Sequence, residues 1–439
     1  MEEKDLPMEL LFHVFSMLPD GMKPVAARTC RRWYSCCPKR FRRRLSLVTA
    51  CGSLALLKWA HRDEGFPLDG RTCRLAAKSG SLEALKWARE QGCAWDIWTS
   101  IWAAQNGHLE MLQWAREQGC PWNWMTCAKA AAGGHLKVLQ WAHERGCPWD
   151  EETCCFAAMN GHLVVLQWAR EQGCDWNEWT CAQAAKNGHL EVLQWAREQG
   201  CPWDERTCSN AARWGHLTVL QWVREKGCPW NEETCSEASE GGHLEVLRWA
   251  RANGCPWDER TCSSAAHNGH LEVLQWARGN GCPWDEATCA LAAAAAFEKK
   301  GSASSLEVLQ WARANGCPWN ELTCYYAAKH GDLQVLQWAR EQGCEWDESI
   351  CSAAATNGHL AVLRWAREHG CPWNEATCAC AAENGHLEVL QWAREHGCPS
   401  NEQCFVQASR HGHVNVLQWA RDHGCPDWDS APVPLTSEL

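Results

Sequence analysis

The sequence lacks an apolar segment long enough to cross a bilayer. Its longest uncharged apolar run lies near Ala290–Phe297, whereas a transmembrane helix needs about 20 apolar residues. The first residues, Met1–Asp5, are mostly charged and do not form the apolar core of a secretory signal. We therefore expect an intracellular protein, in the cytoplasm or nucleus of its own or a host cell, that does not bind membranes.

The sequence also lacks the common motifs of catalysis. No phosphate-binding loop, dinucleotide fingerprint or set of nucleophile, base and orienting residue stands out. We therefore expect a protein that is not an enzyme, with no catalytic residues and no cofactor.

Positive charge is scarce outside the N-terminal segment. The formal net charge is −11, and residues 1–44 carry ten lysines and arginines against five aspartates and glutamates. The rest of the chain therefore has a net charge of −16. Because acidic surfaces repel phosphates, we expect no nucleic acid as the main ligand.

Tryptophan and cysteine, by contrast, are abundant, with 32 and 31 residues, and they recur at fixed positions. A Leu-Gln-Trp-type triplet ends at 14 tryptophans from Trp59 to Trp419, and 11 of the 13 spacings are 27 residues. Such a period is typical of stacked supersecondary units. We predict 14 units over residues 45–428, an eight-residue insertion near 294–304 that extends one helix through 292–297, and a disordered tail over 429–439.

One unit, residues 204–230, predicts two helices and no strand. Asp204 suits an N-cap, because its carboxylate can accept free backbone N–H groups. Small residues such as Cys208 allow close packing of the first helix, and Gly215 suits a left-handed helix end. A second helix is expected over 217–226. The predicted fold is all-α, a helix–turn–helix repeat solenoid with a small N-terminal helical module.

Histidine and cysteine recur in most units, and both have a structural interpretation. Where the histidine after the glycine is missing, the position holds good N-cap residues, so we expect the histidines to cap helices. Those residues are Ser53, Ser81, Ser305 and Asp332. The cysteines are spaced more widely than zinc ligands usually are, so we expect buried thiols and no metal site.

The repeat frame resembles the ankyrin repeat. The match is Thr-Cys-x-x-Ala-Ala-x-x-Gly-His-Leu-x-Val-Leu over residues 207–220. The period is shorter than the usual 33 residues, and the missing residues fall where ankyrin repeats carry their fingers. The resemblance implies a stack of helix pairs, with shortened fingers, that binds proteins.

Some positions differ from unit to unit within this constant frame. In the first helix these are the residue before the Thr-Cys pair and the second and fifth residues after it, which share one face. Their aromatic and charged content predicts a surface for a target protein; the alternative is a set of weakly constrained solvated positions. The residues expected to bind the target are Trp98, Trp102, Lys129, Phe156, Trp179, Gln183, Arg206, Asn210, Arg213, Trp214 and Tyr326.

The N-terminal 44 residues carry a different pattern. It reads Leu-Pro-x-Glu-Leu-Leu, then Val-Phe-Ser-x-Leu-Pro and Cys-Arg-Arg-Trp, and it resembles an F-box. The resemblance implies a helical module, residues 1–44, that docks on the Skp-family adaptor of cullin-RING ubiquitin ligases. The alternative is a cap on the first repeat. The residues expected to bind the adaptor are Leu6, Pro7, Glu9, Leu10, Leu11, Val14, Phe15, Leu18 and Trp33.

The combination of an F-box with a cysteine- and tryptophan-rich ankyrin-like array resembles protein families of giant DNA viruses. It implies a monomeric substrate-recognition subunit of a ubiquitin ligase, with a role in host–virus interaction. Two alternatives stay open: a binding scaffold without a ligase link, and a cysteine-rich metal or redox buffer.

Overall fold

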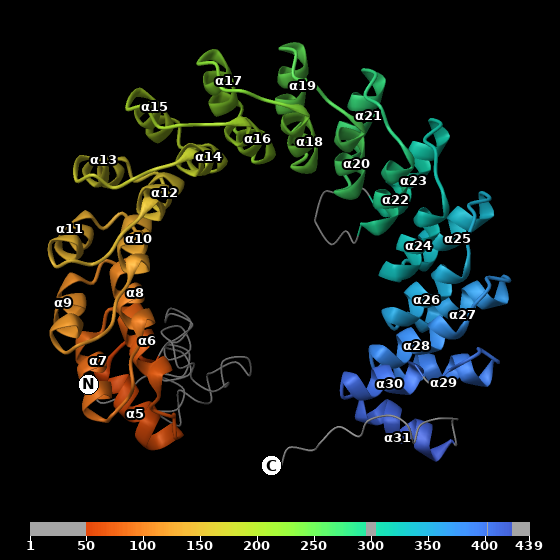
Figure 1. The fold of residues 1–439 in the computed structure, drawn as a ribbon, viewed down its shortest axis with the longest axis horizontal. Coiled ribbons are helices and arrows are strands. Elements are labelled where there is room, and N and C mark those ends of the chain that lie inside the picture. The colour runs from red at the N-terminus through yellow and green to blue at the C-terminus, as the bar shows by residue number, and fades with distance from the viewer. Residues whose placement is uncertain (1–49, 296–303, 402, 424–439) are drawn as a thin grey trace, which may run out of the picture. The chain divides into compact units, whose positions relative to one another are not determined.

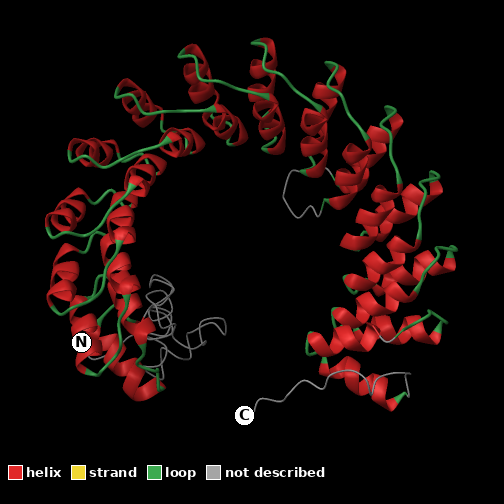
Figure 2. Ribbon diagram, viewed as in Figure 1, coloured by secondary structure: helices red, strands yellow, loops and turns green. Residues whose placement is uncertain are grey.

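The computed structural model describes residues 50–295, 304–401 and 403–423. The chain divides into two compact units, Met1–Trp203 (unit 1) and Asp204–Leu439 (unit 2). In both, the described secondary structure consists of helices joined by short loops, with no strand among these residues (Figure 2). The predicted all-α fold of repeated helix–turn–helix units is confirmed. The expected module 1–44 and tail 429–439 lie outside the described residues.

Each repeat has a first helix and a second helix, which carry even and odd labels respectively (Figure 1). The described helices of unit 1 are α5 (Leu54–Glu64), α6 (Gly70–Ser79), α7 (Leu82–Glu90), α8 (Ile97–Gln105), α9 (Leu109–Glu117), α10 (Trp124–Ala132), α11 (Leu136–Glu144), α12 (Glu151–Met159), α13 (Leu163–Glu171), α14 (Glu178–Lys186) and α15 (Leu190–Glu198).

Unit 2 repeats the same pattern. Its described helices are α16 (Glu205–Arg213), α17 (Leu217–Glu225), α18 (Glu232–Glu240), α19 (Leu244–Ala252), α20 (Glu259–His267), α21 (Leu271–Gly279), α22 (Glu286–Ala294), α23 (Ser305–Ala314), α24 (Glu321–His330), α25 (Leu333–Glu341), α26 (Glu348–Thr356), α27 (Leu360–Glu368), α28 (Glu375–Glu383), α29 (Leu387–Glu395), α30 (Gln403–Arg410) and α31 (Val414–Asp422).

The first helices begin and end as the sequence predicts. The Asp204 carboxylate accepts the backbone N–H of Arg206 at 3.1 Å, which satisfies one free donor of α16. After α16, Gly215 adopts φ 76°, the left-handed conformation that favours glycine. Gly227 has φ 81° after α17. The turns that define each repeat are therefore set by local sequence.

The core lies between the two helix layers and between neighbouring first helices. Within each unit, first helices of consecutive repeats pack side by side (Figure 1). Cys208, Ala211 and Ala212 of α16 are fully buried, and so are Leu220 and Val223 of α17. The small side chains on the first helices permit this close approach, while the branched side chains of the second helices fill the space behind them.

Tryptophan and arginine connect consecutive repeats beside the second helices. Trp122, in the connector after α9, meets Trp141 of α11 edge to face, with ring centroids 5.8 Å apart. The Arg116 guanidinium lies 4.4 Å from the centre of the Trp122 ring and donates to the Cys120 carbonyl at 3.2 Å. Cation–π and edge-to-face contacts of this kind add to the stability that burial supplies.

The prediction that the histidines cap the second helices is wrong for the side chains. His135 occupies the N-cap position of α11 but makes no side-chain capping bond. Its Nε2 instead lies 3.1 Å from the carbonyl oxygen of Gln105, in the preceding repeat. The ring packs over Gly107, where an added Cβ would lie 2.6 Å from Nδ1. The histidine therefore links two repeats.

The residues that replace histidine do cap their helices at three of the four compared positions. Ser81 accepts the backbone N–H of Ala84 at 3.4 Å, and Asp332 accepts that of Val335 at 3.0 Å. Ser53 likewise accepts from Leu56. The capping prediction thus holds for these serine and aspartate side chains, because their short oxygen-bearing groups reach the N-terminus of the helix. The imidazole ring of the histidines is directed toward the preceding repeat instead.

Two predictions about the insertion need correction. Helix α22 ends at Ala294, and Ala295 is extended with φ −82° and ψ 117°, so the helix does not continue through 292–297. Ser304, rather than Ser305, caps α23 and accepts the backbone N–H of Glu307 at 3.2 Å. Ser305 instead donates to the Ala295 carbonyl at 2.5 Å, which ties the two ends of the insertion together.

Candidate functional site

The candidate site lies on the first helices, at their second, sixth and ninth residues, which we call the variable stripe. Over five consecutive repeats the residue at each of these positions changes from one repeat to the next. The sixth residues of α8, α10, α12, α14 and α16 are Trp102, Lys129, Phe156, Gln183 and Asn210.

The second helices offer a comparison, because one of their exposed positions is constant over the same repeats. Their ninth residue is an exposed glutamate in the same five repeats. These glutamates are Glu117, Glu144, Glu171, Glu198 and Glu225. Other exposed positions of the second helices do vary, as at Lys137 and Val164, so variation alone does not mark a binding face. The aromatic and charged content of the stripe is what favours recognition there.

The variable stripe of unit 1 is aromatic and cationic. Its 15 positions on α6, α8, α10, α12 and α14 include four aromatic residues, four lysines or arginines and one acid. The aromatic residues are Trp98, Trp102, Phe156 and Trp179. The cations are Arg71, Lys78, Lys129 and Lys186, and the acid is Glu152.

Two of these lysines lie over aromatic rings of the next repeat. Lys78 Nζ is 4.7 Å from the centre of the Trp102 ring, and Lys129 Nζ is 4.1 Å from that of Phe156. No carboxylate pairs with either lysine within the part of the chain that the structure describes. The stripe therefore joins consecutive repeats into one surface with unneutralised charge.

The variable stripe of unit 2 is nearly neutral, and its arginines pair with acids. Arg213 Nη1 lies 2.6 Å from Glu237 Oε2 and 3.0 Å from Glu240 Oε2. Arg206 Nε lies 2.7 Å from Asp204 Oδ2, and its Nη2 lies 2.5 Å from the same oxygen. Tyr326 is the one aromatic residue at the second, sixth or ninth positions of α16, α18, α20, α22, α24, α26 and α28.

All eleven residues expected to bind a target lie in the described helices or directly after one. Trp98, Trp179 and Trp214 are the most exposed, with 38%, 44% and 51% of their surface accessible. Trp214 is the C-cap residue of α16 rather than a member of the stripe. The other eight are half-buried: Trp102, Lys129, Phe156, Gln183, Arg206, Asn210, Arg213 and Tyr326.

The part of the variable stripe on α6 was not predicted from the sequence. Arg71, Leu75 and Lys78 occupy the stripe positions of α6. The signal was the Thr72-Cys73 pair, which aligns α6 with the later first helices. Gly70 is the first residue of α6, where Asp69 caps the helix as Asp204 caps α16.

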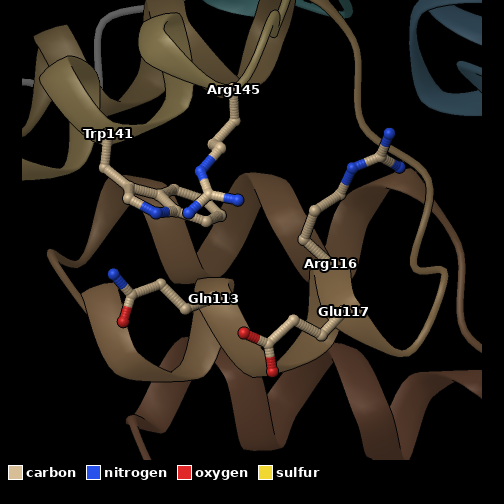
Figure 3. Close-up of a pocket in the computed structure, with 5 residues that line it drawn as sticks. All are labelled: Gln113, Arg116, Glu117, Trp141 and Arg145. Carbon is tan, nitrogen blue, oxygen red and sulfur yellow. The ribbon is translucent and has the colours of Figure 1, made fainter.

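The pocket shown in Figure 3 is a repeated structural feature rather than a separate site. It has a volume of about 420 Å³ and lies between α9 and α11, lined by Gln113, Arg116, Glu117, Trp141 and Arg145. Similar pockets occur at Trp114 in unit 1 and at Trp276 in unit 2. Because equivalent positions of consecutive second helices line all three, the pocket recurs with the repeat and is no separate site.

The cysteines form buried rows along each unit. The Cys228 thiol lies 3.4 Å from the Asp204 carbonyl oxygen, to which it donates. Burial raises the pKa of Cys73 and of Cys155 to about 12, so both thiols stay protonated at neutral pH. No group of three or more metal-ligating side chains is suitably placed in the described residues. Protonated, inaccessible thiols are poor metal ligands, which favours a packing role.

The comparisons with known proteins address the N-terminal segment and the helical array separately. An F-box-like family model matches residues 4–48. This segment includes every residue expected to bind an adaptor, and it lies outside the described residues. No curated protein matches the chain.

Solved structures match the chain at low similarity. Two are crystal structures of the pentatricopeptide repeat protein PPR10 in complex with an 18-nucleotide psaJ RNA element, one of them with three cysteines replaced by serine. Each is 15% identical, covers 95% of this chain and 74% of the other, and has a TM-score of 0.36. The likenesses to ankyrin repeats and to viral families are not supported by these matches and stay predictions.

None of the described helices combines the length and apolar content required to span a bilayer. The described residues thus form an all-α repeat array, and residues 4–48 match an F-box-like family model.

Proposed function

We propose that the protein is a non-catalytic substrate-recognition subunit of a cullin-RING ubiquitin ligase. The F-box-like segment would bind the Skp-family adaptor, and the variable stripe would bind a target protein. Ubiquitin transfer would be carried out by partner subunits, and this chain would contribute proximity.

The observation that carries the adaptor half is the F-box-like match at residues 4–48. The spacing of its apolar residues is the feature a docking module needs. Burying a leucine or phenylalanine side chain contributes about 1.5–3 kcal/mol, so a few such residues can hold an interface together.

The target half rests on the variable stripe and its content. The stripe changes from repeat to repeat and in unit 1 gathers four aromatic residues and four cations, whereas the ninth residue of the second helices is glutamate at every repeat from α9 to α17. A scaffold without a ligase link shares this surface and differs only in the adaptor. A metal or redox buffer is disfavoured because nearly all described cysteines are buried, and burial raises the pKa of thiols such as Cys73 and Cys155.

Co-purification of the full chain with a Skp-family adaptor tests the proposal. The double substitution Leu10→Ala with Phe15→Ala should weaken adaptor capture by about a hundredfold or more, because two buried apolar side chains are lost. The matched control, Trp102→Ala with Phe156→Ala, should retain adaptor capture. Adaptor binding at the wild-type level by the first variant would show that the segment is only a cap and would end the ligase proposal.

A further inference from the structure

We propose that the unit 1 variable stripe binds an acidic protein segment that also carries aliphatic or aromatic side chains. The inference rests on the proposed role of the array in target binding and adds the chemistry of the target.

Charge is the first argument. Four cations against one acid give this stripe a positive balance on a chain whose net charge is −11. Lys78 and Lys129 have no carboxylate partner among the described residues. A bound carboxylate would supply the counter-charge that both lysines lack, and complementary charge of this kind speeds association and selects partners.

The aromatic residues define the rest of the partner. Trp98 and Trp179 expose 38% and 44% of their surface on α8 and α14. Partly buried rings are held in place and can bury further apolar area, which makes aromatic residues frequent centres of binding energy. A segment that alternates acidic with apolar side chains could pair with the lysines and pack on these rings at once.

The position of the lysines favours a peptide over a single-stranded nucleic acid. Proteins that bind single strands stack bases on open aromatic faces. Here Lys78 lies over the Trp102 ring and Lys129 over the Phe156 ring, at 4.7 and 4.1 Å from the ring centres. A base could stack on these covered faces only after displacing a lysine, whereas a carboxylate can approach Nζ from outside.

Unit 2 offers a built-in control. Its Arg213 is already paired with Glu237 and Glu240, and its stripe has one aromatic residue, Tyr326. Lys329 Nζ lies 5.8 Å from the Tyr326 ring centre, but both residues are on α24, so this pair does not join consecutive repeats as the unit 1 pairs do.

The test is a fluorescence-anisotropy titration of the full chain with labelled probes. The probes are a peptide of repeated Glu-Leu-Asp-Phe, a charge-reversed peptide of repeated Lys-Leu-Lys-Phe, an apolar-depleted peptide of repeated Glu-Ser-Asp-Ser, and an oligouridylate of matched length. We expect the first probe to bind most tightly. Lys78→Glu with Lys129→Glu should weaken it by about tenfold or more, since attraction becomes repulsion, and Lys329→Glu should change it less than about twofold.

Several results would overturn the inference. They are equal or tighter binding of the oligouridylate, equal binding of the charge-reversed or apolar-depleted peptide, no binding of any probe, and no effect of the double lysine variant. Circular dichroism verifies that each variant is folded. If target capture depends on Trp102 and Phe156 while no probe binds, the recognition role of the array survives and only the partner chemistry is wrong.

Discussion

The two units share one frame and differ in what they display on it. In unit 1, Lys129 lies over Phe156 and forms no ion pair with a described residue, while in unit 2 Arg213 is neutralised by Glu237 and Glu240. The turn glycines, capping acids and buried leucines are alike in both. The comparison teaches that the frame determines the fold and the stripe residues determine what each unit can bind.

The largest expected effect is on target binding through unit 1. The triple substitution Trp98→Ala, Trp102→Ala and Phe156→Ala should weaken target capture by about a hundredfold or more, because truncated aromatic anchors commonly cost 2 kcal/mol or more each. Its counterpart in unit 2 is Arg206→Ala, Asn210→Ala and Tyr326→Ala, for which we expect a loss below about fivefold. Quantitative pull-down with the full chain measures both, and equal losses would erase the distinction between the units.

Substitutions in the frame should act alike in both units. Gly107 and Gly242 have φ 75°, and an added Cβ would lie 2.6 Å from the ring of His135 or of His270. Each change to alanine should cost about 2–4 kcal/mol, through the strained backbone and the displaced ring. Gly119→Ala is the matched control, with φ 83° but open space around it, and should cost only about 1–2 kcal/mol. Denaturant midpoints of the three variants check the ranking.

These glycine sites also show how far the sequence could predict the fold. Helix bounds, N-caps such as Asp204 and left-handed glycines follow from local rules, so the repeat could be built correctly from its residues. The role of His135 could not, because its partner Gln105 lies 30 residues earlier and becomes a neighbour only when repeats stack. The end of α22 at Ala294 was also not predicted, because a run of alanines by itself favours a longer helix.

The sequence predicts where the variable stripe lies, but it does not predict which of its charged side chains are paired. Internal comparison of the repeats located the stripe, because constant frame residues mark where variation occurs. The pairing of Arg213 with Glu237 and Glu240 depends on contacts between consecutive repeats, and so does the placement of Lys129 over Phe156. Arg213 and Lys129 were therefore predicted as equivalent binding residues, although one is neutralised by acids and the other is not.

Acidification should destabilise both units to a similar extent. Burial lowers the pKa of His135 in unit 1 and of His243 in unit 2 below the usual 6.5. The unfolded chain then binds more protons than the folded one, so stability is full above about pH 6.5 and falls as the pH drops through that value. Thermal melts between pH 7.5 and 5 should show this loss, and His135→Gln should reduce it. A gain of stability on acidification would contradict the lowered pKa of these histidines.

The smallest expected effect separates a pairing arginine from a binding lysine. Arg213→Ala should lower the stability of unit 2 by about 1 kcal/mol or less, because partly exposed ion pairs contribute little. Lys129→Ala should leave stability within about 0.5 kcal/mol while weakening target binding. Chemical denaturation of both variants is the check, and a larger loss for Lys129→Ala would mean that Lys129 stabilises the fold.

Photo-crosslinking tests the central claim most directly. A photoactivatable residue is placed in the full chain at Phe156 or Gln183 of the unit 1 stripe, and at Glu171 or Glu198 on the second helices of the same repeats. The chain is then irradiated with its captured target. The account predicts crosslinks to the target from positions 156 and 183 and none above background from 171 and 198. Crosslinks from 171 and 198 with none from 156 and 183 would place the bound target on the second helices and contradict binding by the variable stripe.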